Sequence, residues 1–265
     1  MKDQILTALS ENYPWKEQLH WFDTIGSTND ELKRMARAGA PQGTVLISGH
    51  QTGGRGRIGR SFQSPAGMGV YLSMLLRPDV PARELMHLTC ATAVAMCDAV
   101  ETAVGIRPGI KWTNDLVIGK HKLGGILTEL GFGSGGNVEY VIVGVGINCT
   151  QRPGDFSPEI RDIATSLEMA CSTQVDRVSV AAAMMEALYG MHLDLLPHKE
   201  DILRRYRRNC ITLGQQISIY RGEEVRYAVA LDVDEQGALV VAFADGTVEA
   251  VNSGEVSVRG MYGYI

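Results

Sequence analysis

The sequence of 265 residues has no apolar run near the ~18 residues that a membrane-spanning helix requires, so we expect no membrane partner. Its first residues include Asp3 and Glu11 and form no continuous apolar core, which argues against a signal peptide. There is also no basic excess, because 25 Lys and Arg stand against 30 Asp and Glu. The resulting charge of −5 argues against a general nucleic-acid partner and makes any basic cluster a local feature.

Cysteine is scarce and follows no metal-binding or disulfide pattern. The five cysteines are odd in number and contain no CxxC spacing. We therefore expect buried free thiols in a protein of the reducing cytoplasm, and we assign no metal ligands. The hydrophobic share of 45% permits a sizeable core in one or two domains.

The most distinctive stretch is Gln51 to Arg60, which reads QTGGRGRIGR and contains three arginines and four glycines. Apolar segments typical of strands precede it at 44–50 and follow it at 69–76. Glycine lets a backbone approach a ligand closely, and arginine offers a permanent charge with a planar fork of donors. We interpret this loop as an anion clamp that suits a nucleotide phosphate.

The same stretch permits two other interpretations. Gly54, Gly56 and Gly59 fit the dinucleotide fingerprint G-x-G-x-x-G, but that motif must open a helix. The segment that follows, RSFQSPAGMG, has no helical period, so this interpretation is disfavoured. A solvated basic loop without a ligand remains an open alternative.

The chain before this loop predicts a lead-in at 1–20, a short strand at 21–26 and a helix at 27–39. Thr28 and Glu31 have the spacing of a capping box at the start of that helix. The polar residues at the helix start can serve as plain caps, and they can also offer hydroxyl and amide groups to a ligand.

The middle of the chain predicts a largely buried helix at 84–104 and strands within 109–130. A turn at Thr113–Asn114–Asp115 interrupts these strands, and Gly119–Lys120 is typical of a hairpin tip. Two lysines lie in otherwise apolar segments, where an unpaired charge would be costly. Lys111 and Lys122 should therefore contact acidic partners or an anionic ligand, and the nearby acidic candidates are Asp115 and Glu129.

The last part of the chain predicts a buried strand at 138–148, irregular structure at 149–176 and two helices at 177–196 and 199–208. From residue 213 onward, five short strands alternate with turn signals, which is typical of a small SH3-like barrel. We place a domain boundary between residues 212 and 213.

Several separated segments together resemble the biotin–protein ligases, also called biotin–[acetyl-CoA-carboxylase] ligases. They occur in the family's order over roughly residues 20–260: STND (27–30), QTGGRGRIGR (51–60), YLSMLLRP (71–78), KWTNDL (111–116), KLGGILTEL (122–130), GVGINC (144–149), ATSL (164–167) and SGEVSVRG (253–260). Thr113 departs from the proline usual in the family, for which we expect altered turn rigidity. Family members that repress transcription carry an N-terminal winged helix-turn-helix domain, and the short lead-in suggests the catalytic-only class.

The resemblance implies an α+β fold in two domains. Residues 1–212 would form a catalytic domain like those of lipoate–protein ligases and class II aminoacyl-tRNA synthetases, with a mixed sheet flanked by helices. Residues 213–265 would form the SH3-like domain.

The resemblance also implies a two-step reaction. Biotin and ATP, with Mg²⁺ on the phosphates, would give biotinyl-5′-AMP and pyrophosphate. Biotin would then pass to a lysine of the biotin carboxyl carrier protein, and AMP would leave. A cytoplasmic enzyme with no nucleic-acid partner is expected, and a homodimer is an open alternative to a monomer.

The family motifs assign roles residue by residue. The implied catalytic residues are Lys122, Arg55, Arg57 and Asp115. Biotin contacts are implied for Ser27, Thr28, Asn29, Gln51, Gly54, Arg55, Gly56, Arg57, Lys122, Gly124 and Gly125. Contacts to ATP or the adenylate are implied for Arg55, Arg57, Arg60, Lys111, Trp112, Asn114 and Asn148.

Other functions remain to be distinguished from this one. Lipoate or octanoate transfer could use the same scaffold, although the GRGRIGR loop argues against it. A non-catalytic biotin or adenylate sensor would bind its ligand without releasing pyrophosphate. An SH3-type interaction protein is disfavoured because the chemical motifs lie outside 213–265.

Overall fold

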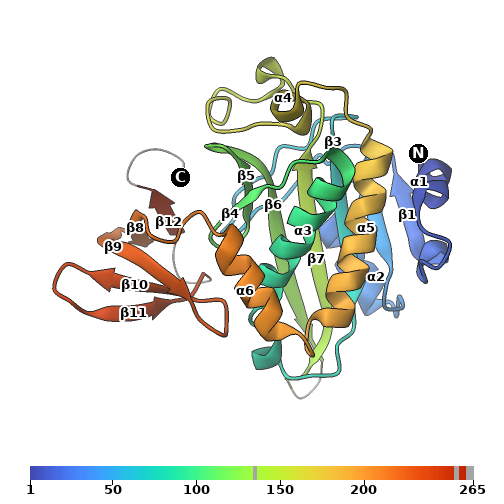
Figure 1. The fold of residues 1–265 in the computed structure, drawn as a ribbon. Coiled ribbons are helices and arrows are strands. Elements are labelled where there is room, and N and C mark those ends of the chain that lie inside the picture. The colour runs from blue at the N-terminus through green and yellow to red at the C-terminus, as the bar shows by residue number, and fades with distance from the viewer. Residues whose placement is uncertain (134–135, 254–256, 261–265) are drawn as a thin grey trace.

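The computed structural model describes residues 1–133, 136–253 and 257–260, so part of the matched segment 253–260 lies outside the described residues. A seven-stranded sheet forms the centre of the molecule (Figure 1). Its strands, in spatial order, are β1 (Leu19–Phe22), β2 (Val45–Ser48), β3 (Gly69–Leu76), β7 (Val138–Asn148), β6 (His121–Phe132), β5 (Asp115–Ile118) and β4 (Gly109–Lys111).

The sheet is mixed, as predicted. β1 pairs with β2 in parallel, and every other neighbouring pair is antiparallel. β3 is buried at every position and β7 at all but one. Strands covered on both faces read as nearly continuous apolar runs, which is why these two were visible in the sequence.

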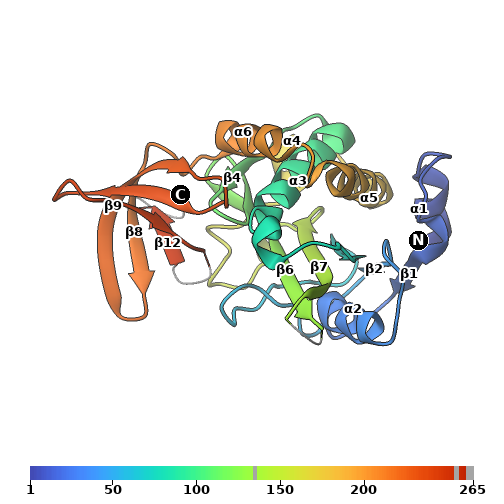
Figure 2. The ribbon, with the colours of Figure 1, turned by 90° about the horizontal axis from the view of Figure 1, so that it is seen from below.

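Three helices cover one face of this sheet (Figure 2). They are α3 (Leu88–Val104), α5 (Arg177–Asp194) and α6 (Lys199–Asn209). α3 is buried over most of its length because small apolar residues let it pack closely against α5 and the sheet. The main hydrophobic core lies in this layer. Among the described residues, no helix is long and apolar enough to cross a membrane.

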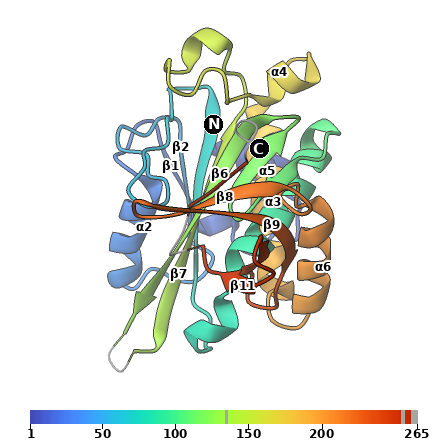
Figure 3. The same cartoon turned by 90° about the vertical axis from the view of Figure 1, so that its left-hand side faces the viewer.

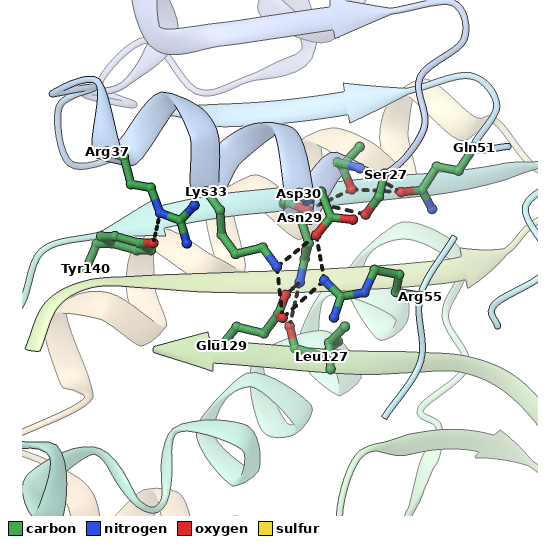
Figure 4. A network of polar contacts seen from close by, with 12 residues as sticks. Ser27, Asn29, Asp30, Lys33, Arg37, Gln51, Arg55, Leu127, Glu129 and Tyr140 are labelled. Carbon is green, nitrogen blue, oxygen red and sulfur yellow. Dashed lines mark hydrogen bonds and ion pairs between the residues drawn. The ribbon is translucent and has the colours of Figure 1, made fainter. Parts of the chain in front are cut away.

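The opposite face carries α2 (Thr28–Arg37) over a separate small core. Leu32 and Ala36 of α2 pack there against apolar side chains of β2, β3 and β7. Because side chains alternate along a strand, the residues that meet α2 are interleaved with those that meet α3 and α5. The N-terminal end of α2 projects toward the loop that follows β2 (Figure 4).

Several predicted boundaries were wrong. The lead-in contains the helix α1 (Lys2–Ala8) and the short helix η1 (Lys16–Gln18), and the strand expected at 21–26 lies at 19–22, where it pairs with β2. The cap of α2 is Ser27, whose hydroxyl accepts from the Asp30 amide, and not Thr28.

The remaining helical boundaries differ more modestly. The helix expected at 84–104 begins at Leu88, after the short helix η2 (Ala82–Leu85). The segment expected to be irregular contains η3 (Pro153–Asp155) and α4 (Leu167–Cys171). Ser166 caps α4 by accepting from the Met169 amide, a local signal that the sequence prediction did not use.

The C-terminal strands form a separate five-stranded antiparallel sheet, which lies toward the viewer in Figure 3. In chain order they are β8 (Gln216–Arg221), β9 (Glu224–Val233), β10 (Leu239–Phe243), β11 (Val248–Val251) and β12 (Ser257–Gly260). Trp112 Nε1 donates to the carbonyl of Gly237 at 3.0 Å, and Arg207 Nε of α6 donates to that of Val233 at 2.9 Å. These bonds hold the second sheet against the first domain, and the predicted α+β organisation is confirmed.

Candidate active site

A cavity of about 610 Å³ lies where the N-terminal end of α2, the Arg/Gly loop and the strands β4 to β7 meet. It brings together most residues that the sequence assigned to ligand binding. Those residues are Ser27, Thr28, Asn29, Gln51, Arg55, Gly56, Arg57, Arg60, Lys111, Trp112, Asn114, Asp115, Lys122 and Gly125.

The floor of the cavity depends on two glycines of β7. Gly144 and Gly146 point to the same face because they are two residues apart on a strand. A Cβ added at Gly144 would lie 2.1 Å from Asn29 Oδ1, and one at Gly146 would lie 2.5 Å from the Phe62 ring. The missing side chains therefore leave the space in which Asn29 and Phe62 sit.

Gln51 ties the start of α2 to the Arg/Gly loop. Its side-chain oxygen accepts from the backbone amide of Thr28 at 2.9 Å and from the Thr28 hydroxyl at 3.0 Å. Its nitrogen donates to Ser64 Oγ at 3.0 Å. Thr28 and Ser64 are both buried, and partners at both ends of the Gln51 side-chain amide fix its orientation.

Asn29 is buried and has partners at both ends of its side-chain amide. Nδ2 donates to Glu129 Oε2 at 2.8 Å and to the Leu127 carbonyl at 3.2 Å, and Oδ1 accepts from Ser73 Oγ at 2.6 Å. The position of Asn29 at the helix start therefore serves more than capping. It places a polar group on the floor of the cavity.

The arginines of the loop are held in two different ways. Arg55 Nη1 lies 2.5 Å from Asp30 and 3.3 Å from Glu129 (Figure 4). Arg57 Nη1 donates to Asn114 Oδ1 at 2.9 Å, and its Nη2 donates to the carbonyl of Ser253 in the C-terminal domain.

These contacts test the alternatives for the loop. Burial and the neighbouring charge of Arg60 lower the pKa of the Arg57 guanidinium, although the Asp115 carboxylate opposes this shift. A basic loop that merely faces solvent would have no such half-buried arginine. The dinucleotide interpretation fails as well, because the chain passes from the loop into β3 without a helix.

Lys122 has the acidic partner that its apolar surroundings required. Its Nζ lies 2.6 Å from Asp115 Oδ1, and both residues line the cavity. A Cβ at Gly125 would lie 3.5 Å from the same Nζ, so a glycine there leaves room around the ammonium. The other suggested acid, Glu129, pairs with Lys33 and Arg55 instead.

Three predicted ligand contacts do not lie on the cavity. A Cβ at Gly54 would meet the Phe62 carbonyl at 2.3 Å, and one at Gly124 would meet the Gly146 carbonyl at 2.3 Å, so both glycines permit close backbone packing. Asn148 Nδ2 donates to the Thr165 carbonyl at 3.0 Å. All three support the residues around the site.

The sequence analysis missed part of the cavity lining. The sequence predicts a strand at Gly144 and Gly146 but gives them no separate role, and their signal was the alternation of glycine with valine, which puts both glycines on one face. The other missed positions are mostly apolar: Ile58, Ser61, Phe62, Ile126, Leu127, Val145, Ile160, Ile163 and Val258. Together they form an apolar slot beside a group of cations, which suits a ligand with an apolar body and an anionic end.

The cysteines take no part in this site. All five are free, and four of them are buried, as predicted. Burial raises the pKa of Cys90, Cys97 and Cys149 to about 12, so these groups are neutral thiols at physiological pH. No cysteine is found on the described lining of the cavity.

The carboxylates of the described residues do not form a resident metal site, because no group of three or more His, Cys, Asp or Glu side chains is found there. Asp115 is the one carboxylate on the described lining. A single carboxylate suits an ion such as Mg²⁺ that arrives already bound to the phosphates of a nucleotide.

Two family models match the chain. The "Biotin/lipoate A/B protein ligase family" matches residues 21–148, and the "Biotin protein ligase C terminal domain" matches residues 212–259. The first of these ranges holds the Arg/Gly loop, Lys122 and the glycines of β7.

Curated proteins and a solved structure are also similar. The Bacillus subtilis bifunctional ligase/repressor BirA is 35% identical over 87% of this chain and 71% of its own length. The biotin–[acetyl-CoA-carboxylase] ligase of Mycobacterium tuberculosis is 33% identical over 97% of this chain and 93% of its own. The biotin protein ligase of Aquifex aeolicus, solved with biotin and ATP, matches with a TM-score of 0.77 and 28% identity over 91% of this chain and 98% of that chain.

Proposed function

Because the chain belongs to the biotin protein ligase family, we propose that it activates biotin with ATP and transfers it to a lysine of a biotin carboxyl carrier protein. The observation that carries this proposal is that three cations, Lys122, Arg55 and Arg57, line one partly apolar cavity. That arrangement fits a reaction in which two anions must approach each other.

In the first step, a carboxylate oxygen of biotin attacks the α-phosphorus of ATP. The bond between the α-phosphorus and the bridging oxygen breaks, and pyrophosphate leaves with that electron pair. Lys122 and Arg57, which both line the cavity, would neutralise charge on the carboxylate and the phosphoryl oxygens. Fixed cations in a site shielded from water stabilise such a transition state without reorganising.

In the second step, the neutral ε-amine of the carrier lysine attacks the carbonyl carbon of biotinyl-5′-AMP. An amide bond forms, the proton of the amine is lost, and AMP leaves. The 2.6 Å contact between Asp115 and Lys122 supports the role of Asp115 as the group that orients the ammonium. Lys122 would then stabilise the oxygen charge in both steps.

The biotin site would be the part of the cavity under α2. Ser27, Thr28, Asn29 and Gln51 offer a few fixed polar groups there, next to apolar side chains of β6 and β7. A ureido ring needs such a small set of oriented donors and acceptors in an apolar slot. Gly56 and Gly125 let backbone approach the ligand.

The nucleotide would occupy the side of the cavity near β4 and the C-terminal domain. Lys111, Trp112, Asn114 and Arg60 line that side, and Val258 contributes from the second sheet. Mg²⁺ would enter as part of the substrate, on the ATP phosphates. The site residues found outside the lining, Gly54, Gly124 and Asn148, would act on the ligand only through their neighbours.

The finer points of the assignment belong to the same proposal. We place the boundary of the two domains between residues 212 and 213, and we expect a cytoplasmic enzyme without a nucleic-acid partner. A homodimer stays open as an alternative to a monomer. The substrate would be the carrier protein of acetyl-CoA carboxylase or of another biotin-dependent carboxylase.

The test is the exchange of labelled pyrophosphate into ATP by the purified protein with Mg²⁺, with biotin and lipoate in parallel reactions. The proposal requires exchange that depends on biotin. Exchange with lipoate alone would assign the protein to lipoate transfer, and binding of biotin without any exchange would make it a sensor.

A further inference from the structure

The carboxylate of Glu129 lies between the two parts of the candidate site without lining the cavity itself. Oε2 accepts from Asn29 Nδ2 at 2.8 Å. Oε1 lies 3.1 Å from Lys33 Nζ and 3.3 Å from Arg55 Nη1 (Figure 4). One carboxylate thus contacts a residue of the cavity floor and a residue of the Arg/Gly loop.

We propose that Glu129 is a positioning residue for biotin, which fixes the side-chain amide of Asn29 and anchors Arg55. This inference rests on the function proposed above and adds a residue to it. Glu129 reaches the site because β6 alternates: Gly125, Leu127 and Glu129 share the face that is turned toward α2.

Glu129 determines which group Asn29 presents to a ligand. The Glu129 carboxylate and the Leu127 carbonyl can only accept hydrogen bonds, so both N–H groups of Asn29 must point to them. The Asn29 oxygen already accepts from Ser73 and keeps one free acceptor position. Asn29 therefore offers an acceptor to the cavity, which suits an N–H group of a ureido ring.

The same orientation passes along a chain of hydrogen bonds. The Ser73 hydroxyl lies 2.6 Å from Asn29 Oδ1 and 2.7 Å from Thr28 Oγ1. The Ser73 hydroxyl has a single proton, so while it donates to Asn29 it leaves its oxygen to the Thr28 hydroxyl. The backbone amide of Thr28 in turn donates to Gln51 at 2.9 Å, at the start of the Arg/Gly loop. Removing the charge of Glu129 weakens the stronger of the two acceptors that set this direction and leaves the Leu127 carbonyl as the other.

Glu129 is also the better shielded of the two carboxylates that hold Arg55. Its side chain is 21% exposed, against 51% for Asp30. Attraction between charges weakens with hydration, so the more enclosed carboxylate gives the firmer anchor. Lys33 contacts both carboxylates, at 2.8 Å from Asp30 and 3.1 Å from Glu129, and so bridges the two groups that hold Arg55.

The test compares Glu129→Gln with Glu139→Gln, a matched control on β7 whose carboxylate lies 3.9 Å from Arg77 and far from the cavity lining. Biotin binding is measured by calorimetry without ATP, and KM and kcat are measured by pyrophosphate exchange. We expect Glu129→Gln to raise the biotin Kd and the biotin KM about 10-fold, the scale of one charge-assisted hydrogen bond. The ATP KM and kcat should change less than about 3-fold.

Each other result overturns the inference. An unchanged biotin Kd removes Glu129 from biotin recognition, even where wild-type exchange confirms the ligase. A fall in active fraction and thermal midpoint with unchanged KM makes its role structural. If the wild type binds no biotin, the proposed function fails together with the inference. Should Glu129→Gln not fold, Glu129→Asp keeps the charge, shortens the reach to Asn29 and should show the same selective rise in the biotin Kd.

Discussion

The ammonium of Lys122 is the cation whose loss should damage the reaction most, because it faces the cavity and is held by Asp115 at 2.6 Å. We expect Lys122→Ala to reduce biotin-dependent pyrophosphate exchange about 10²-fold or more, the scale of losing one transition-state donor. Lys120→Ala, an exposed lysine at the hairpin tip of the same strands, is the control and should exchange normally. Activity of Lys122→Ala within a few-fold of wild type would remove Lys122 from the mechanism.

A side chain at Gly144 should damage the site as well, because there is no space for it. A methyl group there would lie 2.1 Å from Asn29 Oδ1, so Gly144→Ala must displace Asn29 from the floor of the cavity. We expect the biotin Kd to rise more than about 10-fold, since a displaced polar contact costs ~1–3 kcal/mol. Gly190→Ala, in α5 with nothing within 4 Å of its Cβ, is the control and should bind biotin normally. Equal biotin Kd values in the two variants would mean that Asn29 can move aside without loss of biotin binding.

At the scale of elements, the start of α5 offers a test of stability that leaves the site alone. Asp176 accepts from the amides of Val178 and Ser179 at 3.0 and 3.1 Å and from the Ser179 hydroxyl at 2.6 Å. We expect Asp176→Ala to lower the free energy of unfolding by ~1 kcal/mol in urea titrations at pH 7 and to leave biotin binding unchanged. An unaltered unfolding midpoint would mean that water replaces the cap without loss.

The same cap should depend on pH in a defined direction. The Ser179 hydroxyl and the two amides lower the pKa of the Asp176 carboxyl below its ordinary value. A lowered pKa in the folded state gives stability that is present above the unfolded value, about 3.9, and is lost as the pH falls further. The difference between wild type and Asp176→Ala should therefore be constant from about pH 7 to 5 and shrink below about pH 4.

Elements whose burial is uniform were predictable from the sequence, and elements set by distant partners were not. β3 and β7 lie between two layers, so their apolar runs gave their positions almost to the residue. β1 was shifted by two residues at its start because its register comes from pairing with β2, some 25 residues later. Local patterns do not contain that information.

The same distinction applies to the site. The Arg/Gly loop and Lys122 stood out because charge in an apolar context is unusual. Glu129 did not stand out, because its role depends on a hydrogen bond from Asn29, which is 100 residues away in the chain. Gly54 and Gly124 looked like ligand contacts since sequence cannot tell whether a close approach is made by a ligand or by another strand.

For the whole molecule, the C-terminal sheet matters to the active site because it supplies Val258 to the cavity and the Ser253 carbonyl to Arg57. Arg207 of α6 helps to hold that sheet through the carbonyl of Val233 and the carboxylate of Asp232, each at 2.9 Å from its Nε. Arg207→Ala should therefore weaken the reaction from a distance.

We expect Arg207→Ala to raise the ATP KM about 3- to 10-fold and to speed proteolysis near the domain boundary by a similar factor, since the lost contacts are worth ~1 kcal/mol. Lys122 and Asp115 are untouched by the change, so the chemical step itself should be preserved once ATP saturates. Arg204→Ala is the matched control, because Arg204 lies on the same helix but is 70% exposed and pairs only with Asp201 within α6 among its described contacts. Equal ATP KM values in the two variants would mean that the second sheet completes the cavity without help from Arg207, and that its other contacts, such as the Trp112 hydrogen bond and the shared core, keep it in place.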